Sequence, residues 1–220
     1  MIAVSTDYLT IINALPPNAA TFFHDVAWEE YKHLVNELGH APCVRMAYDS
    51  GTLQIMTTSP KHERIAGMLG WLVLEISREL RIHLETIRSA TLMSEQVKKG
   101  TEADDCFYIQ HAAQVIGKDI DLNFDPPPDL AIEVDLSSPS LQKFPIYAAL
   151  GVPELWRYKK GRITFYQLGT GKYEEISHSI AFPFLTPDVL VEYVHRGLEQ
   201  GQTDTLWAFA DWVKANKSNV

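Results

Sequence analysis

A chain of 220 residues, 46% hydrophobic and 21% charged, has the length and composition of a globular protein with one substantial core. Its formal net charge of −9 argues against a surface that binds nucleic-acid phosphates over its whole extent, although a local basic groove is compatible with an acidic average. No stretch approaches the ~20 apolar residues of a membrane helix, no signal peptide is recognisable, and two cysteines do not make a disulfide framework. We therefore expect a cytoplasmic protein without a membrane partner.

The first half of the chain predicts two helices separated by a hairpin. Apolar residues at helical spacing predict a helix over residues 21–38. Residues 45–56 are typical of a β-hairpin, with its turn at Asp49-Ser50-Gly51. Ser59 is a good N-cap before a proline, and the apolar residues that follow at spacings of three and four predict a helix over residues 60–83.

The second half is dominated by strand patterns and ends in two helices. The expected elements are strands in 86–94 and 104–110, a connecting loop over 111–128, a central strand at 129–136, a short helix at 144–150 closed by Gly151, strands at 155–159 and 163–168, a hairpin at 169–176, and helices near 189–198 and 205–215. This order predicts a mixed α/β fold. We expect one domain, with a core at about 25–185 and a helical extension at about 186–216.

The predicted central strand carries three carboxylates. Asp129, Glu133 and Asp135 share one face because strand side chains alternate, whereas the other face is aliphatic. Carboxylates on a buried strand are unfavourable unless a cation neutralises them. Mg²⁺ is a suitable cation, since it prefers a few carboxylate oxygens and retained waters.

The rise of an extended strand limits which carboxylates can share one ion. At ~3.3 Å per residue, Asp129 and Glu133 are about 13 Å apart, whereas Glu133 and Asp135 are about 7 Å apart. A second ligand should therefore come from another strand, and Asp104, which opens the run DDCFYI, is our choice. Two alternatives stay open: Asp104 as a strand-end carboxylate, and Glu133 in a structural salt bridge with Lys143.

Five segments carry a family resemblance: YDSGTLQIM, TSPKHERI, GTEADDCFYI, PPPDLAIEVDLSSPS and KFPIYAALGVPELW. In this order and spacing, from about residue 28 to residue 184, they resemble the restriction-endonuclease family of the PD-(D/E)XK nuclease superfamily that is abundant in cyanobacterial genomes. The resemblance implies a restriction-endonuclease-like core, in which helices flank a mixed central β-sheet and the catalytic acids lie on two adjacent strands.

The resemblance also implies roles for individual residues. Asp104 and Glu133 would be catalytic and would bind the metal. The chain has Ala103 where the pattern has a proline, and Asp135 where the superfamily lysine normally stands; Lys143 fits the relocated lysine of this family. Gln54 occupies a position where related sequences often have an acidic residue, and His62 lies in a family-like run at the start of its helix.

Together these residues predict a Mg²⁺- or Mn²⁺-dependent endonuclease that hydrolyses the DNA backbone, with Lys143 orienting the water or stabilising charge on the phosphate. The main alternative is a nuclease-fold binding or assembly module that no longer cuts, which the acidic charge, Gln54 and Asp135 favour. A third is a hydrolase of another phosphate ester. His62 either lines the site or bonds the end of its own helix, and Asp129 either lines it or caps the strand entrance.

A homodimer is compatible with cleavage of both strands of a duplex by a two-fold pair. The apolar stripe formed by Leu206, Phe209 and Trp212 is the expected interface.

Overall fold

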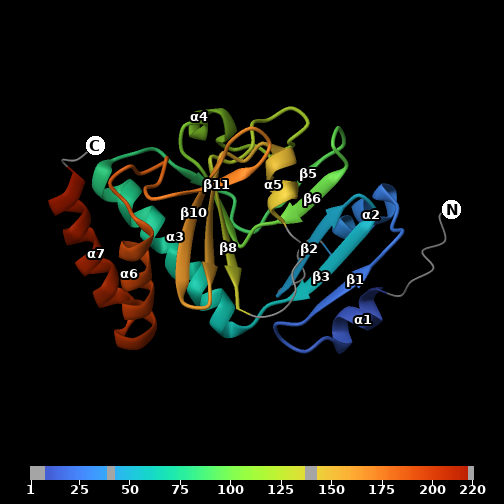
Figure 1. Cartoon of the computed structure of the whole chain (residues 1–220), viewed down its shortest axis with the longest axis horizontal. Helices are drawn as coiled ribbons and strands as arrows, with labels where there is room; N and C mark the ends of the chain where they lie inside the picture. Colours follow the sequence, from blue (N-terminus) through green and yellow to red (C-terminus); the bar gives the residue numbers. More distant parts are fainter. Residues whose placement is uncertain (1–7, 39–42, 137–142, 218–220) are drawn as a thin grey trace.

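Two β-sheets and the helices around them make up the computed structural model of the chain, which describes residues 8–38, 43–136 and 143–217. The predicted mixed α/β class is confirmed. The N-terminal elements and the C-terminal helices lie at opposite ends of the molecule (Figure 1). Residues 137–142, which include the Ser-Pro-Ser part of one matching segment, lie outside the described residues.

The first sheet is antiparallel and has the strand order β1-β3-β2-β6-β5. Its strands are β1 (Ala20–Phe23), β2 (Val44–Asp49), β3 (Thr52–Thr57), β5 (Thr91–Ser94) and β6 (Lys99–Glu102). The predicted hairpin is confirmed as β2 and β3. Ser50 and Gly51 both have positive φ, as a type I′ turn requires.

The predicted helix over 21–38 is wrong in its first part. Residues 20–23 form β1, which pairs with β3, and α2 begins only at Trp28 (Trp28–Leu38). The run Ala-Thr-Phe-Phe suits a pleated strand, here at the edge of the sheet, and Asp25, with φ of 58°, separates the strand from the helix. Trp28 and Tyr31 then bury the helix against this sheet, together with α1 (Tyr8–Ala14).

The second sheet has the strand order β11-β10-β9-β8-β7-β4, in which β8 and β9 are parallel. Its strands are β4 (Glu85–Thr86), β7 (Asp105–Tyr108), β8 (Leu130–Asp135), β9 (Glu154–Lys159), β10 (Arg162–Leu168) and β11 (Tyr173–Ile176). The predicted central strand is therefore confirmed as β8. Helix α5 (Phe144–Leu150) lies between β8 and β9 in the chain, and Gly151, with φ of 79°, ends it as predicted.

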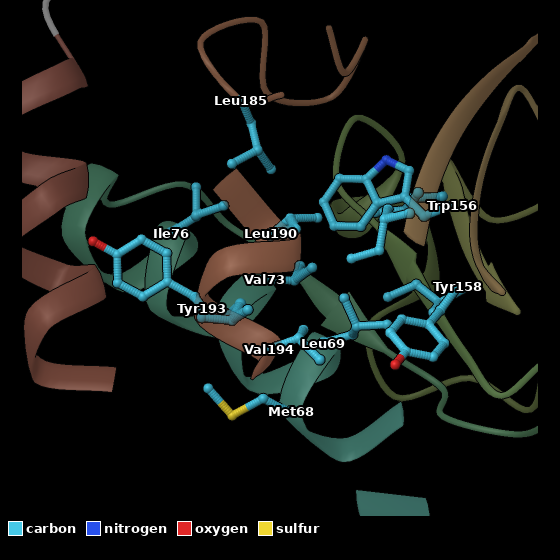
Figure 2. Close-up of a cluster of buried hydrophobic side chains, with 14 of the residues drawn as sticks. Met68, Leu69, Val73, Ile76, Trp156, Tyr158, Leu185, Leu190, Tyr193 and Val194 are labelled. Atoms are coloured by element: carbon cyan, nitrogen blue, oxygen red, sulfur yellow. The ribbon is translucent and has the colours of Figure 1, made fainter. Parts of the chain in front are cut away.

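Helices α3 (Pro60–Leu80), α6 (Pro187–Gln200) and α7 (Gln202–Asn216) cover one face of this sheet (Figure 1). Ser59 caps α3 as predicted: its hydroxyl accepts the His62 amide at 3.3 Å. The helix ends three residues before the predicted limit because Arg81 turns left-handed, with φ of 55°. Figure 2 shows the core that results, where side chains of α3 and α6 meet Trp156 of β9.

The alternation along β8 separates two environments. Leu130, Ile132 and Val134 point into the α3 core. Ala131 packs instead with Ile146, Tyr147 and Leu155 on the opposite, α5 side of the sheet. Glu133 therefore faces α5, as the predicted two-faced strand requires. The connection over 111–128 contains one short helix, α4 (Ala112–Val115), that the sequence did not predict.

The apolar stripe suggested as a dimer interface faces inward. Phe209 is fully buried, and Trp212 stacks on it with ring centroids 5.7 Å apart. Both pack against the core beneath α3 and α6. The exposed aromatic residue of α7 is Trp207. Among the described helices, none combines the length and the apolar character needed to cross a bilayer.

The two cysteines should differ sharply in reactivity. Cys43 is exposed and Cys106 is buried, and neither forms a disulfide. Burial raises the pKa of the Cys106 thiol well above its usual value, so little reactive thiolate forms there. We expect a thiol reagent such as Ellman's reagent to titrate one group per native chain and two after unfolding in guanidinium. Two rapidly reacting thiols in the native protein would contradict the burial of Cys106.

Candidate active site

Asp104 lies at the point where the chain passes from the first sheet to the second, between β6 and β7. The register that pairs Asp105 with Ile132 places Asp104 opposite Glu133, and the Asp104 amide donates to the Ile132 carbonyl at 3.0 Å. Side chains that stand opposite each other have Cβ atoms roughly 5 Å apart. The Oδ2 atom of Asp104 accepts the Val134 amide at 2.7 Å, which holds the carboxylate against β8.

Glu133 is held from the other side by helix α5. Lys143 Nζ donates to Oε1 and Oε2 of Glu133 at 3.0 and 2.9 Å, and the Tyr147 hydroxyl donates to Oε1. Lys143 and Tyr147 are four residues apart at the start of α5 and therefore project on the same side. The third N–H of Lys143 reaches the Glu102 carbonyl at 3.2 Å, so all three of its donors are used.

Two further cations approach Asp104. His62, on the first turn of α3, places Nε2 3.3 Å from Asp104 Oδ2. Arg45, near the start of β2, places Nε 3.7 Å from Asp104 Oδ1 and Nη2 3.6 Å from Glu63. Asp104, Glu133, Lys143, His62 and Arg45 are all at most 9% exposed. The centre is thus a buried cluster in which two carboxylates face three basic groups.

The charged groups of this cluster shift one another's pKa values. Burial alone would raise the pKa of Asp104, but its hydrogen bond to His62 and the nearby positive charges hold the pKa below its usual value. Burial alone would lower the pKa of His62, whereas Asp104 and Glu63 raise it to about 10. His62 therefore carries a proton on both ring nitrogens at neutral pH, and Asp104 is ionised.

Glu133 and Lys143 behave as a coupled pair. Burial raises the pKa of Glu133, helped by the charge of Asp104 and opposed by Lys143. Burial opposes the charge on Lys143, but Glu133 and Asp104 together raise its pKa above the usual value. The ammonium of Lys143 is therefore what permits a charged Glu133 at this depth.

The residues present fit a hard divalent ion that keeps some of its own ligands. Asp104 and Glu133 offer two carboxylates on adjacent strands, and a carboxylate retains acceptor capacity beyond the bonds it makes here. In the described part of the chain, no group of three or more His, Cys, Asp and Glu side chains is arranged to hold a metal. Two carboxylates would leave the other positions of such an ion to waters or further oxygen ligands, as is common at Mg²⁺ sites.

Three further residues, Asp129, Gln54 and Asp135, were predicted to line the site. Asp129 turns away at the entrance to β8, where it accepts the amides of Ile109 and His111 and bonds the His111 ring at 2.6 Å. These bonds fit the alternative in which Asp129 caps the strand entrance, because its oxygens serve the preceding loop, and its role in lining the site stays a prediction. Gln54, fully buried, stands on β3 opposite Ala47, a strand further out than β2.

Asp135 stands beyond Glu133 on β8 and pairs with Arg157 of β9 through Nε at 2.7 Å. The guanidinium of Arg157 also lies over the Phe144 ring, 5.5 Å from its centroid. A carboxylate at the superfamily lysine position is thus neutralised by an arginine on the neighbouring strand. It borders the cluster, within electrostatic reach of Lys143.

Arg45 and Tyr147 belong to the cluster and were not predicted. Tyr147 had a usable signal, since it follows Lys143 by four residues on a short helix. Arg45 had none, because it reaches Asp104 only through the pairing of β2 with β6, which are distant in sequence.

Comparison with protein-family models identifies the family of this chain. Residues 28–199 match the Uma2 family model, described as "Putative restriction endonuclease". No curated protein matches the chain. A crystal structure from Anabaena variabilis ATCC 29413, titled as a putative nuclease belonging to DUF820, is 16% identical over 68% of this chain and 90% of that one, with a TM-score of 0.49. Since the family model covers most of the chain, the protein belongs to the Uma2 family, and the resemblance predicted from its motifs is confirmed.

Proposed function

We propose that the protein is a Mg²⁺- or Mn²⁺-dependent endonuclease that hydrolyses the DNA backbone, with its active site at Asp104, Glu133 and Lys143. Membership of the family supports a nuclease-type function. The observation that carries the proposal is the pairing of Asp104 opposite Glu133 on adjacent strands, with Lys143 Nζ within 3.0 Å of Glu133. Two carboxylates and a lysine at one point are the groups that metal-assisted phosphodiester hydrolysis requires.

Each residue has a distinct role in this proposal. Asp104 and Glu133 would hold the ion, which when bound would polarise the phosphate and lower the pKa of a bound water. Lys143 favours the ionised form of Glu133, and its longest bond, 3.2 Å to the Glu102 carbonyl, is the one that an incoming phosphate oxygen or water can replace. Tyr147 donates to Glu133 and so limits the rotation of its carboxylate.

The test is cleavage of supercoiled plasmid with Mg²⁺ or Mn²⁺. We expect the wild type to nick the plasmid and Glu133→Gln to lose roughly 10²–10³-fold in rate, the range for removing one preorganised electrostatic group. Glu154→Gln is the matched control. Glu154 is also a buried strand carboxylate, but it accepts from Trp156, Ile180 and Ala181. Trp156, its neighbour on the same side of β9, packs in the α3 core.

The proposal is decided by comparing plasmid cleavage by the wild type, Glu133→Gln and Glu154→Gln. Loss in Glu133→Gln with retention in Glu154→Gln supports the site. Equal cleavage by the wild type and Glu133→Gln would place the activity elsewhere or in a contaminant. No cleavage of DNA or RNA, single-stranded or duplex, by a folded wild type would reject the enzyme.

A non-cutting binding module is the second candidate, and one observation favours it. The protein's own basic groups already engage both carboxylates, since Lys143 contacts Glu133, and His62 and Arg45 lie beside Asp104. Such a cluster is complete without an ion. Calorimetric titration with Mn²⁺ separates the candidates: the enzyme should bind Mn²⁺ in a way that Glu133→Gln abolishes, whereas the module should bind none.

A further inference from the structure

A cleft of about 760 Å³ opens beside the acidic centre. It lies between the end of α2, the start of β2 and the connection from Ile87 to Thr91. Two of its lining residues also belong to the surroundings of Asp104: Arg45 approaches Asp104 itself, and Glu63 approaches His62. The cleft therefore adjoins the candidate active site through Arg45, and its volume lies within the ~300–1,000 Å³ of ligand pockets.

Arg45 has hydrogen-bonding capacity that the protein does not use. Its Nη1 donates to the Val44 carbonyl at 2.9 Å, but Glu63 and Asp104 stand at 3.6 and 3.7 Å, beyond hydrogen-bond distance. Its Nε is buried and, within the described residues, has no hydrogen-bond partner, although Arg45 is only 9% exposed. Burying a donor without an acceptor is unfavourable, and a guanidinium fork matches a phosphate.

The rest of the cleft has the mixed character of a nucleotide site. Apolar groups of Val35, Ile87 and Ala90 line it together with the polar groups of Asn36 and Ser89. Its two acids are already engaged. Glu102 accepts the Met46 amide at 2.9 Å and the Thr91 hydroxyl at 3.1 Å, and Glu63 lies against His62 and Arg45. Arg88 adds a half-exposed guanidinium, which is paired with Asp105 at 2.7 Å.

We propose that this cleft binds one unpaired nucleotide of the substrate, with Arg45 binding the phosphate that joins it to the scissile position. The inference rests on the proposed function and adds the form of the substrate. A site of this volume accommodates a nucleotide that has left its stack but excludes a base-paired duplex. Arg45 places that phosphate next to Asp104, where cleavage is proposed.

Binding without cleavage tests the inference. The full-length chain is titrated in EDTA into a fluorescein-labelled single-stranded oligodeoxynucleotide and into a duplex of the same sequence, with fluorescence anisotropy as the readout. We expect the single strand to bind at least about tenfold more tightly than the duplex. Arg45→Gln should weaken single-strand binding about 10- to 100-fold, since a bond to a charged group is lost, and Arg45→Lys by less. Arg162→Gln, an exposed arginine of β10, is the matched control and should bind as the wild type does.

Because Arg45 neighbours two carboxylates, its replacement can weaken binding indirectly, by destabilising the folded protein. Ser89→Trp fills the cleft without removing a charge and should weaken single-strand binding by a similar factor, with the melting temperature measured for each variant. Equal binding of single strand and duplex, or wild-type binding by both Arg45→Gln and Ser89→Trp, would overturn the inference. The plasmid assay tests the proposed function separately. Cleavage by a protein whose single-strand binding does not depend on Arg45 would overturn only this inference. Binding that depends on Arg45 in a protein that does not cleave would overturn only the proposed function.

Discussion

Lys143→Met should lose both stability and cleavage. At pH 8 we expect the free energy of unfolding to fall by about 3–5 kcal/mol, because the variant removes the ammonium partner of Glu133, and the buried carboxyl must then either stay charged or take up a proton that the unfolded chain does not bind at this pH. The rate of plasmid cleavage should fall with it. Urea unfolding at fixed pH, followed by circular dichroism, measures the first effect. A loss below about 1 kcal/mol at pH 8 would contradict a buried ion pair.

The pH dependence of this loss has a definite sign. Burial already raises the pKa of Glu133 in the folded protein, and Lys143 is what lowers it. Without Lys143 the folded pKa rises further above the unfolded value, so the folded state of the variant takes up a proton more readily. The contribution of protonated Glu133 to the free energy of unfolding is present at low pH. It is lost as the pH rises through the pKa of Glu133 in the folded protein. The deficit of Lys143→Met should therefore be smaller at pH 5 than at pH 8.

A second substitution separates the charge effect from packing. Glu133→Gln in the Lys143→Met background removes the unpaired charge, and Tyr147 can still donate to the amide oxygen. The double variant should recover most of the lost stability and none of the cleavage. If the double variant is less stable than Lys143→Met, the loss comes from packing rather than from an isolated carboxylate.

Trp156→Ala should be the most destabilising substitution in the core. Trp156 is fully buried, stacks on Phe165 with centroids 4.7 Å apart, and packs against α3 and α6 (Figure 2). Its Nε1 also donates to Glu154 at 2.7 Å, so its removal leaves both a cavity and a buried carboxylate with one donor fewer. We expect a loss of about 3–5 kcal/mol in urea unfolding.

The chain offers a matched tryptophan for comparison. Trp207 of α7 is 64% exposed, and Trp207→Ala should change stability by no more than about 0.5 kcal/mol. Trp156→Phe should lie between the two, because it keeps most of the ring but loses the donor to Glu154. Similar losses for Trp156→Ala and Trp207→Ala would show that the packing in Figure 2 does not govern stability.

Local sequence patterns predicted most of the helices and strands. The cap at Ser59, the alternation along β8 and the glycine after α5 each depend on neighbouring residues alone, and each prediction was confirmed. The wrong prediction, helix over residues 21–27, fell where apolar spacing suited a helix but pairing with β3 made a strand. Strand pairing depends on a distant partner and is invisible in a local window.

The same distinction holds for the candidate site. Glu133 was recognisable because a carboxylate within an aliphatic strand is unfavourable without a partner, and Lys143 was recognisable only through the family resemblance. Arg45 and the cleft beside it arise from the packing of β2 and α2 near the connection that precedes β5. Their position depends on contacts between segments far apart in the chain, which spacing alone does not encode.

The chain passes from one sheet to the other at Asp104, so the candidate site is built from segments that are synthesised at different times. The strands of the first sheet are complete by Glu102, before Glu133 and Lys143 have been added to the growing chain. A nascent protein can therefore hold Arg45 in place on β2 while it still lacks half of its acidic centre. Under the proposed function, cutting can begin only after β8 and α5 have joined the fold, because they carry Glu133 and Lys143.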